Sequence, residues 1–244
     1  MTKHDDILRR AIEVNRLKIS DLLNGSNSLN RLNNFNWLRH ELSYTEPRTL
    51  FYLPQSQQMP YLDYNHMKNL GDAYDHIIEH IAEEITPESI QKMHRILCNG
   101  THIDGGIYRT SGKILEINVN GAKYHAPDYT EIPYRMNEII YTAHNASVPC
   151  FSRAINAHYE LIMLQPFDDF NKRTARIVMN WILLRGGYRP IIFNASKDKQ
   201  LYKEAIIARA NGDGREYTRY MQRCMKRTQE QVLKVLQRSK IFQF

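Results

Sequence analysis

The fold of this chain is most constrained by one segment, Gln165-Pro-Phe-Asp-Asp-Phe-Asn-Lys-Arg-Thr-Ala-Arg176. Before it, residues 151–164 carry apolar side chains at helical spacing, and after it residues 174–184 are apolar on nearly every side. The segment itself contains a proline and charged residues of both signs. The pattern predicts two helices joined by a short polar loop, with the second helix buried at the centre of the protein and ended by Gly186-Gly187.

The remainder of the chain is also mainly helical in its hydrophobic periodicity. A capping residue, Thr86, and Pro87 mark the start of one helix, which should stop near Asn99. Residues 113–119 differ because they have β character and precede Asn120-Gly121, a strong hairpin turn signal. The predicted fold class is therefore mainly α with one β-hairpin. Further helices are predicted over residues 4–23, 32–42, 63–85, 133–141, 198–210 and 214–238.

Composition excludes several classes of protein. No apolar run reaches about 18 residues, so no membrane span is expected, and the polar N-terminus lacks the apolar stretch of a secretory signal. Three widely spaced cysteines fit a reducing compartment and no metal site, so we expect a cytoplasmic protein, with export as an effector left open. The net charge of +7 arises largely after residue 209, either as a solvated helix face or as a contact for an acidic partner. We do not expect nucleic acid as a partner, because no nucleic-acid-binding motif accompanies the charge.

The segment at 165–176 resembles the signature of the Fic/Doc family, His-Pro-Phe-x-(Asp/Glu)-Gly-Asn-Gly-Arg-x-x-Arg. Other elements follow in the family's order: Met93-His94-Arg95-Ile96-Leu97, Gly105-Gly-Ile-Tyr-Arg109, the predicted hairpin, and Gly187-Tyr-Arg-Pro190. The resemblance covers roughly residues 60–225. It implies a Fic-type helical bundle with a β-hairpin flap, with residues 61–244 as the Fic core and C-terminal helices, and residues 1–60 as an N-terminal helical region.

The resemblance also implies a reaction and a set of site residues. Fic enzymes use a nucleotide, usually ATP, most often to transfer AMP to a hydroxyl group of a target protein. By the family's pattern Asp169 would hold Mg²⁺, although Asp168 and Asp169 could instead cap the following helix. The flap would either dock the target protein or only cover the core. The residues that would contact nucleotide phosphates are Asn171, Lys172, Arg173 and Arg176, and those that would form the docking strand are Ile114, Leu115, Glu116 and Ile117.

An inhibitory segment is also implied. In many Fic proteins an N-terminal helix carries a glutamate that pairs with the second signature arginine. Here Leu42-Ser-Tyr-Thr-Glu-Pro47 occupies the corresponding place, with Glu46 as the candidate inhibitory residue and Arg176 as its partner. The alternative is an exposed glutamate in an irregular segment.

The chain departs from the signature at three positions. Gln165 replaces the catalytic histidine, and Phe170 and Lys172 replace the two glycines. A glutamine cannot accept a proton at neutral pH, and His158, two turns earlier, is poorly placed to substitute. Phe170 either fills the space of a phosphate or points outward. We therefore expect a relative of protein adenylyltransferases with impaired or altered catalysis.

Three alternatives stay open at this point. The first is an inactive Fic pseudoenzyme that binds a nucleotide or a protein. The second is a Doc-like kinase or another phosphotransferase, because Asn171-Lys-Arg-Thr-Ala175 is similar to Doc-type members of the family. The third is a nucleic-acid-binding protein, for which only the basic C-terminal stretch argues.

Overall fold

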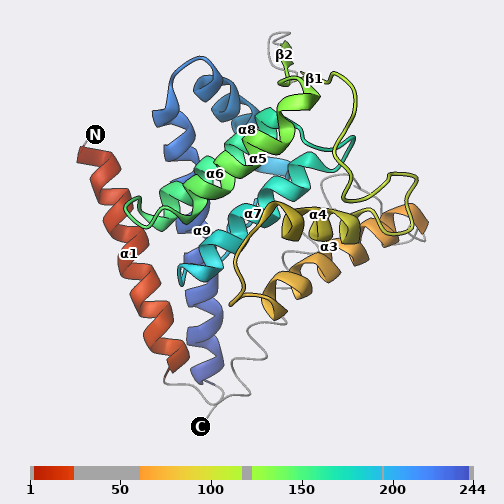
Figure 1. Cartoon of the computed structure of the whole chain (residues 1–244). Helices are drawn as coiled ribbons and strands as arrows, with labels where there is room; N and C mark the ends of the chain where they lie inside the picture. The colour runs from red at the N-terminus through yellow and green to blue at the C-terminus, as the bar shows by residue number, and fades with distance from the viewer. Residues whose placement is uncertain (1–2, 25–60, 117–122, 194, 242–244) are drawn as a thin grey trace. The chain divides into compact units, whose positions relative to one another are not determined.

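The computed structural model describes residues 3–24, 61–116, 123–193 and 195–241, and these divide into two compact units (Figure 1). One unit contains helices α3 to α7 and ends at Gly186. The other contains helix α1 and the chain from Gly187 onwards, with helices α8 and α9. We call them the α3–α7 unit and the α1–α8–α9 unit. The predicted domain boundary at residue 60 and the predicted helix at 32–42 lie outside the described residues.

Over its described residues the α3–α7 unit is helical apart from one short hairpin, which confirms the predicted fold class. Helices α6 and α7 pack side by side, with α5 against α6 and with α3 and α4 against α7 (Figure 1). The helices of this unit are α3 (Tyr61–Glu79), α4 (Pro87–Leu97), the 3-10 turn η2 (Tyr129–Glu131), α5 (Ile132–His144), α6 (Cys150–Leu164) and α7 (Asn171–Arg185).

Helix α7 is the centre of this unit, as its sequence predicted. Its buried residues lie on all sides of the helix and include Ile177, Val178 and Trp181, each no more than 1% exposed. Among its buried polar side chains, Asn180 donates a hydrogen bond from Nδ2 to the hydroxyl of Tyr74 on α3 at 2.9 Å. A buried amide is tolerated here because it has this partner.

Helix α7 starts earlier than the sequence predicted. The predicted start was Thr174, but the helix begins at Asn171. The reason is that Phe170 adopts a left-handed backbone conformation and its carbonyl accepts the N–H of Thr174 at 2.9 Å, which closes the first helical turn. The proposal that Asp168 and Asp169 cap a helix starting at Thr174 is therefore wrong, because the N-cap residue is Phe170.

Helix α4 is capped as its sequence predicted, and a glycine loop packs against it. Thr86 and Ser89 form a reciprocal capping box, and Pro87 is the first helical residue. A Cβ atom added to Gly105 would come within 2.7 Å of the Cα of Arg95, and one added to Gly106 within 2.6 Å of the carbonyl oxygen of Gln91. Only glycine allows the loop this close to the helix.

The predicted β-hairpin is present as two short antiparallel strands. Strand β1 (Ile114–Glu116) pairs with β2 (Lys123–His125), with Leu115 opposite Tyr124. The predicted turn, Asn120-Gly121, lies outside the described residues.

In its described residues the α1–α8–α9 unit contains α1 (Lys3–Asn24), α8 (Ala195–Ala210) and α9 (Gly214–Ile241), with α1 and α8 each packed against α9. On α1, Leu8, Ile12 and Ile19 are buried on one face. Two arginines of the basic C-terminal stretch are engaged inside this unit. Arg219 binds Asp5 of α1 at 2.7 Å, and Arg227 binds the buried Asp198 of α8. Part of the positive charge of the C-terminal stretch therefore stabilises this unit through ion pairs.

Candidate active site

The α6–α7 loop, from Gln165 to Phe170, is bounded by two left-handed residues. Gln165 is the C-cap of α6 with φ 47° and ψ 60°, and Phe170 is the N-cap of α7 with φ 58° and ψ 9°. Among the described residues these are the only residues other than glycine with positive φ. Each costs roughly 1–2 kcal/mol relative to a right-handed conformation. The surrounding contacts must therefore hold the loop in this shape.

The side chain of Gln165 is used by the protein itself. It is 5% exposed, and its Nε2 donates to the carbonyl of Ile162 at 2.6 Å in the last turn of α6. Its own carbonyl accepts from Nε of Arg109 at 2.8 Å. The residue in the expected position of the base is thus a buried helix cap whose amide has no basic nitrogen. His158, the weaker alternative, is fully buried in α6 and cannot meet a substrate hydroxyl.

The ring of Phe170 is turned into the protein, so the outward orientation, one of the two that the sequence left open, is wrong. The residue is 7% exposed. The ring of His66 meets it edge-on, with 5.3 Å between the centroids, and the Cζ atom of Arg173 lies over the ring, 4.4 Å from its centroid. A cation–π contact of this kind holds the first signature arginine against the aromatic ring.

Asn171 closes the loop from the inside. Its Oδ1 accepts the N–H of Phe167 at 2.9 Å, and its Nδ2 donates to the carbonyl of Phe167 at 2.7 Å. The residue is 4% exposed. These two hydrogen bonds give the Asn171 side chain a structural role. The predicted phosphate contact of Asn171 would therefore come from its backbone N–H group, and it stays a prediction.

Helix α7 begins with basic residues, where a helix usually begins with acidic ones. Phe170 offers no side-chain acceptor to the helix N-terminus, and the first turn carries no acidic residue. Lys172 is exposed, while Arg173 and Arg176 are half-buried one turn apart. Positive side chains next to the positive end of a helix dipole favour an anion in the vicinity.

Asp169 is the only predicted metal ligand and is exposed at the edge of the loop. Its Oδ1 accepts the N–H of Phe170 at 2.6 Å. In the part of the chain that the structure describes, no group of three or more His, Cys, Asp or Glu side chains could hold a metal. One carboxylate still fits Mg²⁺, because this ion commonly takes one or two carboxylates and completes its shell with phosphate oxygens and water.

His94 connects the glycine loop to the α6–α7 loop. Its Nδ1 accepts the N–H of Gly106 at 2.8 Å, and its Nε2 lies 3.0 Å from the carbonyl oxygen of Asp169, to which it donates. The ring stacks on Phe167, with 3.8 Å between the centroids and 7° between the planes. Burial lowers the pKa of His94. The neutral ring, with one acceptor and one donor nitrogen, satisfies both partners.

Arg109 and Lys113 connect the base of the hairpin to the same loop. The Arg109 guanidinium is 2% exposed and donates to the carbonyls of Leu164 and Gln165 at the end of α6 and of Ser111 and Pro127 on either side of the hairpin. Lys113 donates to the carbonyls of Phe167, at 3.3 Å, and Asp168. Burial lowers the pKa of Arg109, which remains a cation surrounded by carbonyl dipoles.

The structure thus brings most predicted site residues together. The positions from Gln165 to Arg176 lie on the α6–α7 loop and the first turns of α7. Ile114 lies at the start of β1 and is 49% exposed; its role in docking stays a prediction. Leu115 and Glu116 lie on β1, but their side chains, Ile117 and Glu46 are outside the described residues.

The sequence did not predict that three further residues hold the α6–α7 loop in place: His94, Arg109 and Lys113. The first two stand in motifs that resemble the family's, but a motif does not say which carbonyl a side chain contacts. Lys113 precedes a short strand and carries no sequence signal of its own.

In the described part of the chain, no helix is both long enough and apolar enough to span a membrane.

Comparison with known proteins supports the resemblance. Residues 84–183 match the model of the Fic/DOC family. A protein adenylyltransferase Fic from Nematostella vectensis is 29% identical over 171 residues, covering 68% of this chain and 39% of that protein. One from Drosophila persimilis is 31% identical over 147 residues, covering 59% of this chain and 28% of that protein. The chain therefore spans less than two fifths of the length of either relative.

The fold is also that of a solved Fic structure. The crystal structure of a Fic domain-containing signaling protein from Bacteroides thetaiotaomicron superposes with a TM-score of 0.78, covering 93% of this chain and 97% of that one at 19% identity. At this identity the likeness concerns the fold alone. The family match covers residues 84–183, and the shared fold extends over 93% of the chain.

Proposed function

We propose that this protein is a Fic-type relative of protein adenylyltransferases in which transfer of AMP from ATP to a target-protein hydroxyl is strongly impaired. The observation that carries the proposal is the state of Gln165: at the family's base position stands a buried amide that donates to Ile162. The relatives' names, protein adenylyltransferase Fic, support the reaction class.

The reaction explains why this position matters. The target hydroxyl attacks the α-phosphorus of ATP, a new oxygen–phosphorus bond forms, and the bond to pyrophosphate breaks. The hydroxyl proton must go to an acceptor as the bond forms. Gln165 can accept a hydrogen bond but not a proton. Loss of a general base typically lowers the rate by about 10²–10⁴-fold.

The metal and phosphate side of the site is better preserved. Asp169 would hold Mg²⁺ through its carboxylate, and Arg173 and Arg176 would face phosphate oxygens at the start of α7. When bound, Mg²⁺ supplies charge neutralisation on the phosphates. Phe170 opposes this arrangement, because its buried ring holds Arg173 in a cation–π contact. A nucleotide must compete with this contact, so we expect weak nucleotide binding.

The target protein would dock on the edge of β1. An extended segment can add to a short exposed strand through backbone hydrogen bonds, and Ile114 is exposed there. Arg109 and Lys113 hold the hairpin base to the α6–α7 loop. A segment added to β1 would therefore present its hydroxyl in a fixed relation to that loop.

The test compares label transfer from ATP labelled at the α-phosphate and at the γ-phosphate. The proteins are the wild type, Gln165→His, Phe170→Gly, the double variant, and the double variant with Asp169→Ala. We expect the double variant to transfer α-label at least about 10²-fold faster than the wild type, and Asp169→Ala to abolish the gain. Calorimetry with ATP, with and without Mg²⁺, measures binding separately.

Each other outcome argues against the proposal. A wild type that transfers α-label as fast as the double variant would show that catalysis is not impaired. Label from the γ-phosphate alone would support the Doc-like kinase alternative. If neither the wild type nor the double variant binds a nucleotide, the result would support the alternative of a pseudoenzyme that binds a protein.

A further inference from the structure

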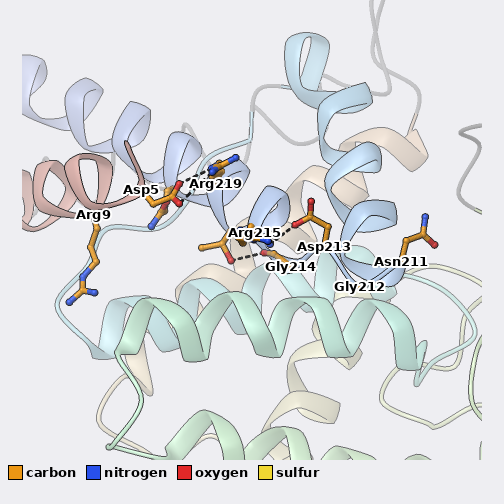
Figure 2. Close-up of a pocket in the computed structure, with 10 residues that line it drawn as sticks. Asp5, Arg9, Asn211, Gly212, Asp213, Gly214, Arg215 and Arg219 are labelled. Carbon is orange, nitrogen blue, oxygen red and sulfur yellow. Dashed lines mark hydrogen bonds and ion pairs between the residues drawn. The ribbon is translucent and has the colours of Figure 1, made fainter. Parts of the chain in front are cut away.

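A polar pocket of about 700 Å³ lies in the α1–α8–α9 unit, where the first turns of α1 meet the α8–α9 turn and the start of α9 (Figure 2). Asp5 and Arg9 come from α1, and Arg215 and Gln222 come from α9. None of its residues belongs to the site described above. The volume is in the range of sites for small organic molecules.

The acidic groups of this pocket are already engaged. Asp5 binds Arg219 at 2.7 Å (Figure 2). Arg219 also binds Glu216 at 2.7 Å. Asp213 caps α9, where its Oδ1 accepts the N–H of Arg215 at 3.0 Å and that of Glu216 at 3.4 Å. The negative charges are therefore balanced by a guanidinium and by a helix N-terminus.

Two positive charges remain. Arg9 and Arg215 line the pocket from different helices, and both are exposed. Within the described residues neither guanidinium has an ion-pair partner. Two guanidinium groups that line one cavity from separate helices favour an anion that accepts several hydrogen bonds.

A buried polar atom at this pocket points to a second feature of the ligand. Gln222 lines the pocket and is 8% exposed, and its Oε1 has no hydrogen-bond partner among the described residues. A buried acceptor without a donor is unfavourable and rare. The terminal torsion of a glutamine is soft, so the amide can turn its acceptor toward a bound molecule. A ligand with an O–H group would satisfy it.

We propose that this pocket binds a small organic phosphate, with the phosphate between Arg9 and Arg215 and a hydroxyl group on Gln222. A phosphomonoester is close to a dianion at neutral pH and offers three strong acceptor oxygens, which match two guanidinium groups. Inorganic phosphate alone leaves most of the volume and Gln222 unused. The ligand joins α1 to α9 and so stabilises this unit by mass action.

The test is calorimetry and thermal unfolding at fixed salt with three probes: glucose 6-phosphate, inorganic phosphate and glucose. We expect glucose 6-phosphate to bind and raise the Tm, phosphate to bind at least about tenfold more weakly, and glucose not to bind. Arg9→Gln and Arg215→Gln should each weaken glucose 6-phosphate at least about tenfold. Gln222→Leu should lower the affinity for glucose 6-phosphate to that for inorganic phosphate, and the affinity for inorganic phosphate should not change.

Two control variants make the assignment specific. Arg223→Gln changes another exposed arginine of α9, which does not line the pocket, and should leave binding unchanged. Arg173→Gln changes the candidate nucleotide site and should also leave glucose 6-phosphate binding unchanged.

The proposal is overturned if glucose 6-phosphate fails to bind at millimolar concentration. It is also overturned if Arg223→Gln weakens binding as much as Arg215→Gln, which would indicate general attraction to a basic surface. Loss of binding in Arg173→Gln would place the phosphate at α7. None of these outcomes depends on AMP transfer.

Discussion

Arg109→Met is the substitution for which the structure predicts the largest structural effect in the candidate site. The guanidinium is 2% exposed and donates at 2.8 Å to Gln165, 3.3 Å to Leu164, 2.5 Å to Ser111 and 2.6 Å to Pro127, in each case to the carbonyl oxygen. Methionine keeps much of the side-chain volume but provides no donor. The four carbonyls then lose a common partner that no nearby side chain replaces.

The size of the effect follows from these contacts. Leaving a buried carbonyl without its donor typically costs about 1–3 kcal/mol, and four carbonyls lose this donor together. Burial disfavours the Arg109 cation, as its lowered pKa indicates, and this offsets part of the loss. Water can also reach some of the carbonyls. We therefore expect the free energy of unfolding to fall by about 3 kcal/mol, which for a chain of 244 residues lowers the Tm by about 6–12 °C.

The assay is urea unfolding with thermal unfolding as a second measurement, and hydrogen exchange reports on the hairpin. The amide of Ala126, which donates to the carbonyl of Lys113 at 2.9 Å, should exchange faster in Arg109→Met because the hairpin base is released. Arg135→Met is the matched control: this exposed arginine of α5 pairs at 2.7 Å with Glu131, the residue just before the helix, and its loss should cost about 0.5 kcal/mol or less.

Arg109→Lys keeps the positive charge but not the planar guanidinium. Its loss in free energy of unfolding should therefore lie between those of Arg109→Met and Arg135→Met. An Arg109→Met protein that unfolds within about 0.5 kcal/mol of the wild type would refute the reasoning. It would mean that the hairpin base and the end of α6 are held together by other contacts.

Phe170→Gly should lower the free energy of unfolding by about 1–4 kcal/mol in urea, because loss of the buried ring costs about 3–5 kcal/mol and relief of the left-handed conformation returns about 1–2 kcal/mol; an unchanged midpoint would contradict the buried position of the ring. The lowered pKa of His94 means that the unfolded chain binds a proton more readily than the folded one, so stability is complete above about pH 6.5 and falls as the pH decreases below it. His94→Gln should flatten the dependence of the urea midpoint on pH between about 7.5 and 5.5, and an unchanged slope would show that His94 does not contribute. Gly106→Ala should destabilise by about 2–4 kcal/mol, because its φ is 81° and a Cβ would lie 2.6 Å from the Gln91 carbonyl, whereas Gly112→Ala, with no atom within 4 Å, should be nearly neutral in the same measurement.

Local patterns in the sequence were enough to predict most elements of the fold. The apolar side chains on every side of the α7 segment predicted a central helix, and Trp181 and Ile177 are indeed buried there. Thr86 and Pro87 predicted the start of α4, since capping depends on neighbouring residues only. The start of α7 was missed by three residues because it depends on the left-handed conformation of Phe170, which propensity alone disfavours.

The candidate site was predicted in its membership but not in its contacts. The departures at positions 165 and 170 were visible in the sequence. What the side chains do there was not: Gln165 caps α6, Phe170 lies under Arg173, and Asn171 binds the backbone of Phe167. Such contacts depend on rotamers and on segments that are distant along the chain.

The sequence by itself determined the helical fold and the order of its elements, because both follow from residue type and local spacing. The resemblance to the Fic/Doc family added the expectation that Gln165 stands where a base would be. Only the tertiary structure decided that Arg109, Lys113 and His94 hold the α6–α7 loop and the hairpin together, and that Arg9, Arg215 and Gln222 line one pocket. The physical reason is that hydrogen bonds and charge pairs act over a few ångströms. Residues tens to hundreds of positions apart come within that range only when the helices pack.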